Sequence, residues 1–378
     1  MDRNTELKLI EEGISLCRDD RRYLDEYSIG RNSDVYLLPE RYATETGAIF
    51  NALPHTVAHS SELPSTTDFL VRELNGHSVL LSRGSDGVVR AFRNVCRHRG
   101  MKLVDTPHGC KRRFVCPYHA WSYDAEGRLI GAPHFDEGFP GLQKQELGLD
   151  RFATLEHAGL IWVSTAKGAT AEQIQAHLQP ISSDLEWLDM AELSVAAETH
   201  LTVCANWKLL VEGGLEAYHF KVAHRNTIGP FFTDNQSTYQ AFGPHIRSVL
   251  LRASFAELGA TPTAARRLRD HANLLYTLLP TTQLLVQQDH VIWISSRPSG
   301  PDLTELRLVT LGHRVSENPD YWQKNHEITE ATLREDFEIG EHIQSGLSAE
   351  FPQRFRFGRF EGALAVFNQT VDAYLDNA

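Results

Sequence analysis

The stretch from residue 65 to residue 164 consists of short apolar runs separated by turn signals. Asn75-Gly76 and Asp86-Gly87 lie between runs of β-type residues, and such pairs are typical of tight hairpins. The β-type runs are residues 69–74, 78–82, 88–92, 114–115, 121–123 and 160–163. The pattern predicts a small all-β domain, which we place at residues 45–165.

The rest of the chain combines helical and extended patterns. Near the N-terminus, Leu7, Ile10, Ile14 and Cys17 recur at helical spacing. The expected helices are residues 1–30, 171–190, 209–224 (interrupted by Gly213-Gly214), 321–346 and 362–375. The expected strands are residues 192–203, 249–251, 281–287, 291–295 and 306–311. One antiparallel sheet with helices to one side predicts a larger α+β domain, formed by residues 1–44 and 166–378.

Composition narrows the class of protein. The 378 residues carry a net charge of −12, which argues against a nucleic-acid partner, because such partners require a basic surface. No apolar run is long enough to cross a membrane, and the N-terminus lacks the basic and apolar segments of a signal peptide. We therefore expect a two-domain cytoplasmic protein with no membrane contact.

Four Cys and His residues form a pair of related boxes inside the predicted all-β domain. Cys96-x-His98 is followed by Cys116-x-x-His119, so each box offers one thiolate and one imidazole. Two thiolates can hold one iron and two imidazoles the other, which is the ligand set of a Rieske [2Fe–2S] cluster. Four such ligands also suit tetrahedral zinc, but zinc sites usually pair Cys with Cys and His with His. The boxes therefore favour the cluster.

The boxes resemble the Rieske family, and two positions indicate which branch. Respiratory members carry an extra Cys in each box, and these two cysteines form a disulfide. Met101 and Tyr118 occupy the matching positions here, so the resemblance is to the oxygenase and ferredoxin branch. Nearby cationic side chains are candidates for neutralising the cluster or docking a reductase, namely Arg97, Arg99 and Arg113.

A second constellation follows about a hundred residues later. Asn206-Trp207-Lys208 precedes Glu216, and then His219 and His224 lie five residues apart. Two imidazoles and one carboxylate on one face of Fe(II) leave positions open for O₂. Taken alone, two such histidines are more often structural.

Together, the two constellations resemble the large (alpha) subunit of Rieske non-heme iron oxygenases, from about residue 40 to the end. The resemblance implies a helix-grip (START-like) catalytic domain and a mononuclear Fe(II) held by His219, His224 and a distant Asp. Asp336 is the expected third ligand, with Glu335 and Asp289 as alternatives. It also implies that Asn206 and Tyr218 line the iron pocket.

The family assembles as a homotrimer, in which the cluster of one subunit meets the iron site of the next. By this resemblance, Glu216 is a catalytic bridge between His219 and a cluster His119 of the neighbouring subunit. Many ring-hydroxylating members have Asp where this chain has Glu216. The Glu resembles members that oxidise quaternary ammonium compounds of the carnitine or choline type.

These features predict the terminal oxygenase of a system that hydroxylates or demethylates a small organic substrate with O₂. No Gly-rich dinucleotide fingerprint is present, so NAD(P)H electrons must come through a separate reductase, with or without a ferredoxin. The alternatives are an aromatic ring-hydroxylating dioxygenase and a plain Rieske electron-transfer protein. Candidate pocket residues are the aromatics Phe231, Phe232, Tyr239, Tyr276 and Trp293, or, for an acid, Arg247 and Arg297.

Overall fold

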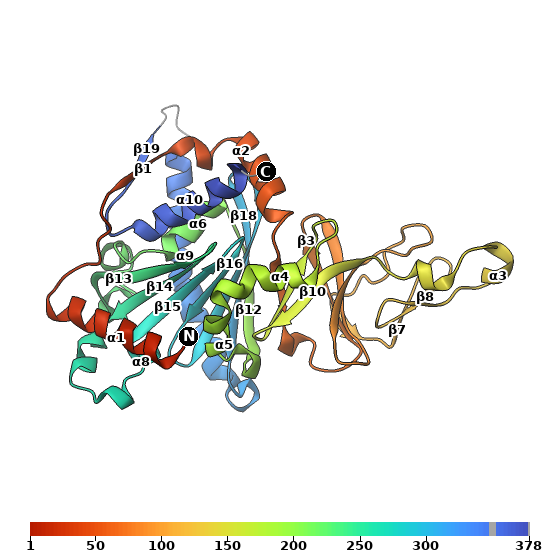
Figure 1. Ribbon diagram of the computed structural model, residues 1–378, viewed down its shortest axis with the longest axis horizontal. Helices are drawn as coiled ribbons and strands as arrows, with labels where there is room; N and C mark the ends of the chain where they lie inside the picture. The colour runs from red at the N-terminus through yellow and green to blue at the C-terminus, as the bar shows by residue number, and fades with distance from the viewer. Residues whose placement is uncertain (348–352, 377–378) are drawn as a thin grey trace. The chain divides into compact units, whose positions relative to one another are not determined.

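The computed structural model describes residues 1–347 and 353–376, which form two compact units (Figure 1). The small unit spans Phe50–Leu178, and the large unit combines Met1–Ile49 with Gln179–Ala378. Helix α4 (Ala171–Leu178) packs against strands β10 and β11 and belongs to the small unit. The sequence-based boundary at residue 165 lies before this helix.

The small unit is made of antiparallel sheets, as the hairpin signals predicted. A seven-stranded sheet has the order β2-β11-β10-β5-β4-β3-β6, and a three-stranded sheet has the order β7-β8-β9. Asn75 and Gly76 both have positive φ, 50° and 74°, as a type I′ hairpin turn requires. The strands are β2 (His55–His59), β3 (Asp68–Leu74), β4 (His77–Arg83), β5 (Val89–Arg93), β6 (His108–Cys110), β7 (Arg113–Val115), β8 (Ser122–Asp124), β9 (Leu129–Gly131), β10 (Arg151–His157) and β11 (Leu160–Ser164).

The large unit is built on a second seven-stranded antiparallel sheet, with the order β12-β18-β17-β16-β15-β14-β13. Figure 1 shows β13 to β16 side by side in green and cyan. Neither β13 nor β15 is among the strands predicted from the sequence; all residues of β15 are buried, so no alternation of apolar and polar residues marks it. The strands are β12 (Ser194–Val203), β13 (Phe232–Phe242), β14 (His245–Arg252), β15 (Ala272–Leu278), β16 (Thr282–Val286), β17 (His290–Gly300) and β18 (Leu303–Gly312), with β1 (Ile29–Asn32) and β19 (Arg354–Phe357) as a separate pair.

The helices of the large unit largely follow the predicted pattern. The predicted interruption at Gly213-Gly214 is confirmed, because α6 ends at Gly214 and α7 begins at Phe220. A Cβ at Gly214 would lie 2.8 Å from Leu275 Cδ2, so the end of α6 approaches the sheet closely. The helix expected at residues 1–30 is observed as α1, which ends at Arg18. The helices are α1 (Arg3–Arg18), α2 (Pro39–Glu45), α5 (Ser182–Trp187), α6 (Trp207–Gly214), α7 (Phe220–Ala223), α8 (Leu268–His271), α9 (Pro319–Leu347) and α10 (Gly362–Asp376).

Helix α9 is a long helix of 29 residues that carries Asp336. It packs against β12, β18 and α6. A Cβ at Gly340 would lie only 3.0 Å from Leu210 Cδ2, so this glycine allows α9 and α6 to approach. The α+β prediction is confirmed. No helix in the described ranges is long and apolar enough to span a membrane.

Candidate metal centres

The two Cys-His boxes of the small unit fold into loops with the same hydrogen-bond pattern. In the first, the Cys96 N–H donates to Met101 O (2.8 Å) and the Gly100 N–H to Cys96 O (3.0 Å). In the second, the Cys116 N–H donates to Trp121 O (2.8 Å) and the Ala120 N–H to Cys116 O (3.0 Å). Gly100 (φ 75°) and Ala120 (φ 60°) both adopt the left-handed conformation that closes the loop.

The side chains of these loops suit an iron–sulfur cluster. Cys96 and Cys116 are buried, at 2% and 3% exposure, whereas both histidines are partly exposed. His98 Nδ1 and His119 Nδ1 lie 3.1 Å apart, so the two rings present the same nitrogen to one point. The Tyr123 hydroxyl lies 3.4 Å from Cys96 Sγ. Buried thiols on one side and converging imidazoles on the other match a Rieske ligand set.

Aromatic rings hold the two imidazoles. The ring of His98 stacks on Trp121, with centroids 4.9 Å apart and an interplanar angle of 11°. The ring of Tyr118 packs against the ring of His119, with centroids 3.7 Å apart. No disulfide joins any of the five cysteines, all of which lie in the described ranges.

In the large unit, His219, His224 and Asp336 come together. Each offers one ligand atom, and these atoms lie within 4.8 Å of one another. His224 Nε2 lies 2.8 Å from Asp336 Oδ1, and His219 Nε2 lies 3.3 Å from the same oxygen. His219 Nε2 is buried and makes no hydrogen bond with the described part of the chain. A buried nitrogen without a hydrogen bond, facing a second imidazole and a carboxylate, fits a two-His, one-carboxylate iron site.

A carboxylate holds the far nitrogen of each imidazole. Glu216 contacts His219 Nδ1 and accepts from the backbone N–H of His219 (3.3 Å). Glu335 Oε2 lies 2.6 Å from His224 Nδ1 and accepts from the Thr227 hydroxyl at 2.7 Å. From the sequence, Glu335 is expected only as an alternative iron ligand. Its contact with His224 shows a supporting position that sequence spacing did not reveal.

The electrostatics follow from this arrangement. Burial disfavours a charged His219 ring, but the carboxylates of Asp336 and Glu216 outweigh it and raise its pKa to about 10. Burial alone would raise the pKa of Asp336, yet His219 and His224 hold that pKa below its usual range. The carboxylate therefore stays ionised, as a metal ligand must.

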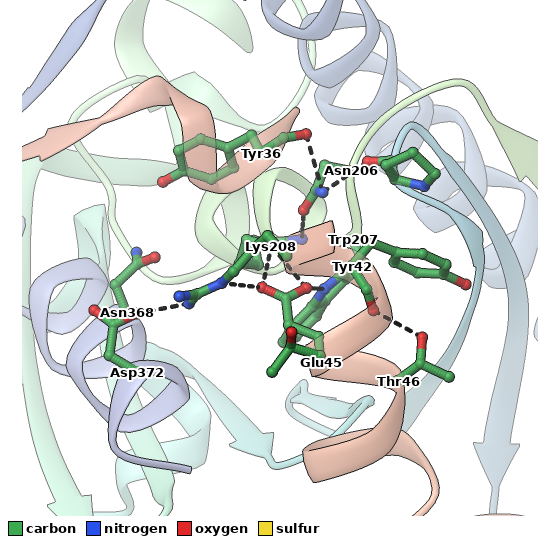
Figure 2. Close-up of polar contacts among 12 residues, drawn as sticks. Tyr36, Tyr42, Glu45, Thr46, Asn206, Trp207, Lys208, Asn368 and Asp372 are labelled. Carbon is green, nitrogen blue, oxygen red and sulfur yellow. Dashed lines mark hydrogen bonds and ion pairs between the residues drawn. The ribbon is translucent and has the colours of Figure 1, made fainter. Parts of the chain in front are cut away.

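Helix α6 is anchored by a buried polar network (Figure 2). Lys208 Nζ donates to both oxygens of Glu45, at 2.7 and 2.9 Å, and Trp207 Nε1 donates to Glu45 Oε2 at 2.8 Å. Lys208 and Glu45 are fully buried. At the other end of α6, Glu212 accepts from Tyr36 and Asn368. The network fixes the helix that leads to Glu216 and His219.

Asn206 has a structural position rather than the pocket position that the resemblance implied. Its Oδ1 accepts from the Lys208 N–H (3.0 Å), which caps α6, and its amide donates to Tyr36 O (3.2 Å) and Pro301 O (2.7 Å). Its own N–H donates to Gln344 Oε1 on α9 at 3.0 Å. Asn206 is not among the described residues that line the cavities beside the iron site.

Two cavities meet at the candidate iron site. One, of about 570 Å³, is lined by His224 and Asp336, and the other, of about 600 Å³, by His219 and Asp336. The second is also lined by Glu216 and by Tyr218, a residue that is 56% exposed. Asp336 therefore lines both cavities.

The first cavity contains some of the predicted pocket residues. Phe231 and Phe232 line it. Tyr276 and Trp293 are buried in the core, and Tyr239 bonds to Asp25 instead. The two arginines expected to bind an acidic substrate do not line this cavity. Arg247 pairs with buried Asp184 (2.5 Å), and Arg297 pairs with Glu305. Asp289, the weaker candidate ligand, pairs with His290 at 2.7 Å.

Comparison with known protein families agrees with this organisation. Residues 54–152 match the Rieske [2Fe-2S] domain, and residues 190–377 match the ring hydroxylating alpha subunit (catalytic domain). Together the two matches cover more than half of the chain. The catalytic match argues against a plain electron-transfer protein.

Individual proteins show the same relationship. The glycine betaine monooxygenase oxygenase subunit of Chromohalobacter salexigens is 28% identical over 386 residues, 89% of this chain and 83% of that protein. The carnitine monooxygenase oxygenase subunit of Escherichia coli (strain K12) is 31% identical over 221 residues, 56% of this chain and 57% of that protein. A crystal structure of the quaternary ammonium Rieske monooxygenase CntA shares the fold, with a TM-score of 0.75 and 23% identity over 91% of this chain and 94% of that one.

The fold and the two centres define an iron-dependent oxidoreductase with an electron-transfer domain and a catalytic domain. The chain belongs to the Rieske non-heme iron oxygenases, as an oxygenase (alpha) subunit. Its cofactors are a [2Fe–2S] cluster and a mononuclear iron. Like other oxygenase subunits, it acts on a small molecule with electrons from a reductase.

Proposed function

We propose that His219, His224 and Asp336 hold the mononuclear iron. The observation that carries this assignment is the convergence of two imidazoles and one carboxylate within 4.8 Å, where two cavities meet. We also assign the cluster ligands, which are Cys96, His98, Cys116 and His119. When bound, the iron supplies O₂ activation and the cluster supplies electrons one at a time.

The surrounding residues prepare this site. Glu216 and Glu335 each hold a proton on Nδ1 of one imidazole, which leaves Nε2 of both rings directed at the metal. These contacts fix the tautomer and the ring orientation of each imidazole before the metal binds. Asp336 contributes the single negative charge of the ligand set.

We propose a quaternary ammonium compound as the substrate class. Glu216, in place of the Asp of many ring-hydroxylating members, supports this class, as do the relatives named for glycine betaine and carnitine. The cavity beside His224 offers the rings of Phe220, Phe231 and Phe232, and aromatic faces attract an ammonium group.

The proposed reaction is hydroxylation of a carbon bonded to nitrogen. One O₂, two electrons and two protons convert an N-methyl group into N-hydroxymethyl and one water. The N–C bond then breaks, which releases formaldehyde and a proton and leaves a tertiary amine. If the oxidised carbon belongs to the substrate chain, the same sequence releases trimethylamine and a carbonyl compound.

The family arrangement, a homotrimer in which Glu216 meets His119 of the next subunit, is also a proposal for this chain. Exposed apolar or aromatic side chains lie near the ligands of each unit: Met101, Val115 and Tyr118 in the small unit, and Tyr218 and Val222 in the large one. Such groups often mark interaction surfaces. Light scattering on the purified protein tests the assembly, and a monomer at micromolar concentration would contradict it. A cytoplasmic location is tested by cell fractionation.

The decisive experiment is a turnover screen of the metal-loaded protein with a surrogate reductase and NADH. The panel includes glycine betaine, carnitine, γ-butyrobetaine, choline and aromatic acids such as benzoate. Formaldehyde or trimethylamine, formed together with O₂ uptake, supports the proposal. A cis-dihydrodiol from benzoate, with no turnover of any ammonium compound, would identify an aromatic dioxygenase instead.

A further inference from the structure

One wall of the cavity beside His224 is a face of the large sheet. Three neighbouring strands each contribute two residues that are two positions apart along the strand: Leu250 and Arg252 on β14, Asn273 and Leu275 on β15, and Gln283 and Leu285 on β16. Alternate residues of a strand share a face, so these strands present one continuous surface. Leu275 and Leu285 are direct cross-strand partners and make its middle apolar.

Polar groups gather at one end of this wall. Arg252 donates through Nε and Nη2 to Asn273 Oδ1, at 2.9 and 2.6 Å. The β15–β16 register, in which Leu274 faces Val286, places Gln287 opposite Asn273 when continued by one residue. Gln287 in turn donates to the Thr329 hydroxyl of α9 at 3.4 Å. This group of residues, Arg252, Asn273, Gln287 and Thr329, is called the polar end below.

The polar end lies away from the metal-binding end of the same cavity. Asp336 and Thr329 both line the cavity from α9, seven residues apart. At a rise of 1.5 Å per residue this spacing is about 10 Å along the helix. The cavity, of about 570 Å³, is therefore suited to a small molecule that is held at both ends.

Arg252 is the only Lys or Arg among the described residues that line this cavity, and Asp336 is the only acid. Arg252 is half-buried and forms no ion pair with any described carboxylate. Burial lowers the pKa of its guanidinium, although Asp289 and Asp270 oppose the shift from a distance. A partly desolvated guanidinium with a neutral partner has a free donor group for an anion.

We propose that Arg252, positioned by Asn273, binds a carboxylate of the substrate, so that the substrate is a zwitterion rather than a simple cation. The inference rests on the proposed function and makes it narrower. The ammonium end lies toward His224 and Asp336, among the phenylalanine rings, and the carboxylate lies at the polar end. Choline, which has a hydroxyl in place of the carboxylate, places no negative charge beside Arg252.

The test compares Arg252→Gln and Arg252→Lys with the wild type. The substrates are γ-butyrobetaine and glycine betaine, each paired with its amide, which keeps the ammonium group but lacks the negative charge. The kcat/KM of the wild type should favour the acid over its amide. In Arg252→Gln, kcat/KM for the acid should fall roughly 10- to 100-fold, as expected for a hydrogen bond to a charged group, with the amide little changed. Arg252→Lys should recover part of the loss.

Two controls separate the inference from the proposed function. Arg356→Gln removes a guanidinium from the other cavity and should leave the preference for acids unchanged. Calorimetric binding of the same betaines gives a readout independent of turnover. Turnover of ammonium compounds with equal kcat/KM for acids and amides in Arg252→Gln and wild type would overturn the anchor but not the proposed function. Arg252-dependent binding of benzoate, without turnover of any betaine, would keep the anchor and overturn the ammonium substrate.

Discussion

The two metal centres obtain their ligands in different ways. The proposed cluster ligands sit on two similar loops of one small unit, and His98 and His119 are only 21 residues apart. At the proposed iron site, His224 and Asp336 are 112 residues apart, with His224 directly after α7 and Asp336 on α9. The first centre is local and the second depends on tertiary packing, so damage to the helices of the large unit should affect only the iron site.

The support of the imidazoles differs as well. Aromatic rings hold His98 and His119, whereas Glu216 and Glu335 hold His219 and His224. Neutral rings position a ligand without adding charge, and a carboxylate also makes the imidazole a stronger donor. The difference suits a cluster that must accept an electron and an iron that must be retained by three ligands.

The largest effect should follow from removing the carboxylate of the proposed iron site. Asp336→Ala is expected to abolish turnover and to lose the mononuclear iron, because two imidazoles alone hold Fe(II) weakly. The visible spectrum of the cluster should remain. Product formation and iron per chain measure the two effects. Glu338→Ala, which changes an exposed acid on the same helix, serves as the matched control. Normal turnover by Asp336→Ala would exclude it as a ligand.

The next effect concerns the anchor of α6. Lys208→Met removes one of the two cations paired with the fully buried Glu45 and leaves only Arg41, at 3.0 Å, which should lower the free energy of unfolding of the large unit by about 1–3 kcal/mol. The small unit should keep its cluster under the same conditions. Chemical denaturation followed by circular dichroism and by cluster absorbance separates the units. Lys324→Met, at an exposed position, should change stability by less than about 0.5 kcal/mol.

A smaller effect is expected from the carboxylate behind His224. Glu335→Ala frees His224 Nδ1 and should weaken iron binding roughly 10- to 100-fold, with cluster content unchanged. Titration of the mononuclear iron against a chelator measures the affinity. Thr227→Val removes the hydroxyl that donates to Glu335 and should act in the same direction but less strongly. Unchanged affinity in Glu335→Ala would show that packing alone orients His224.

The smallest expected effect lies at the cluster. Tyr123→Phe removes the hydroxyl beside Cys96 Sγ, which stabilises the extra negative charge of the reduced cluster. The reduction potential should fall while the iron site and its metal content stay the same. Redox titration followed by visible or electron paramagnetic resonance spectroscopy reports the change. A raised potential would mean that the hydroxyl does not donate to the sulfur.

Particular residues show how far sequence reasoning reached. The hairpin turns, the four cluster residues, the break at Gly213-Gly214 and the convergence of His219, His224 and Asp336 follow from local patterns and from resemblance to the family. Asn206 was expected in the pocket, but its amide is used to cap α6 and to bond Tyr36 and Pro301. The sequence offers Arg247 and Arg297 as partners for an acid, yet the arginine that lines the cavity beside His224 is Arg252. Strand position alone decides which arginine faces the cavity, and no local motif marks it.

By itself, the sequence determined the cluster boxes, the absence of the respiratory disulfide cysteines and the order of the two domains, because these depend on residue type and short spacing. Only the tertiary structure decided that Glu335 supports His224 while Asp336 faces both histidines, although the two acids are neighbours in the chain. It also decided that Arg252 joins Asn273 at the far end of the cavity. The physical reason is that adjacent residues of a helix point in different directions, and only packing of α9 against the sheet and α6 selects which one faces the two histidines.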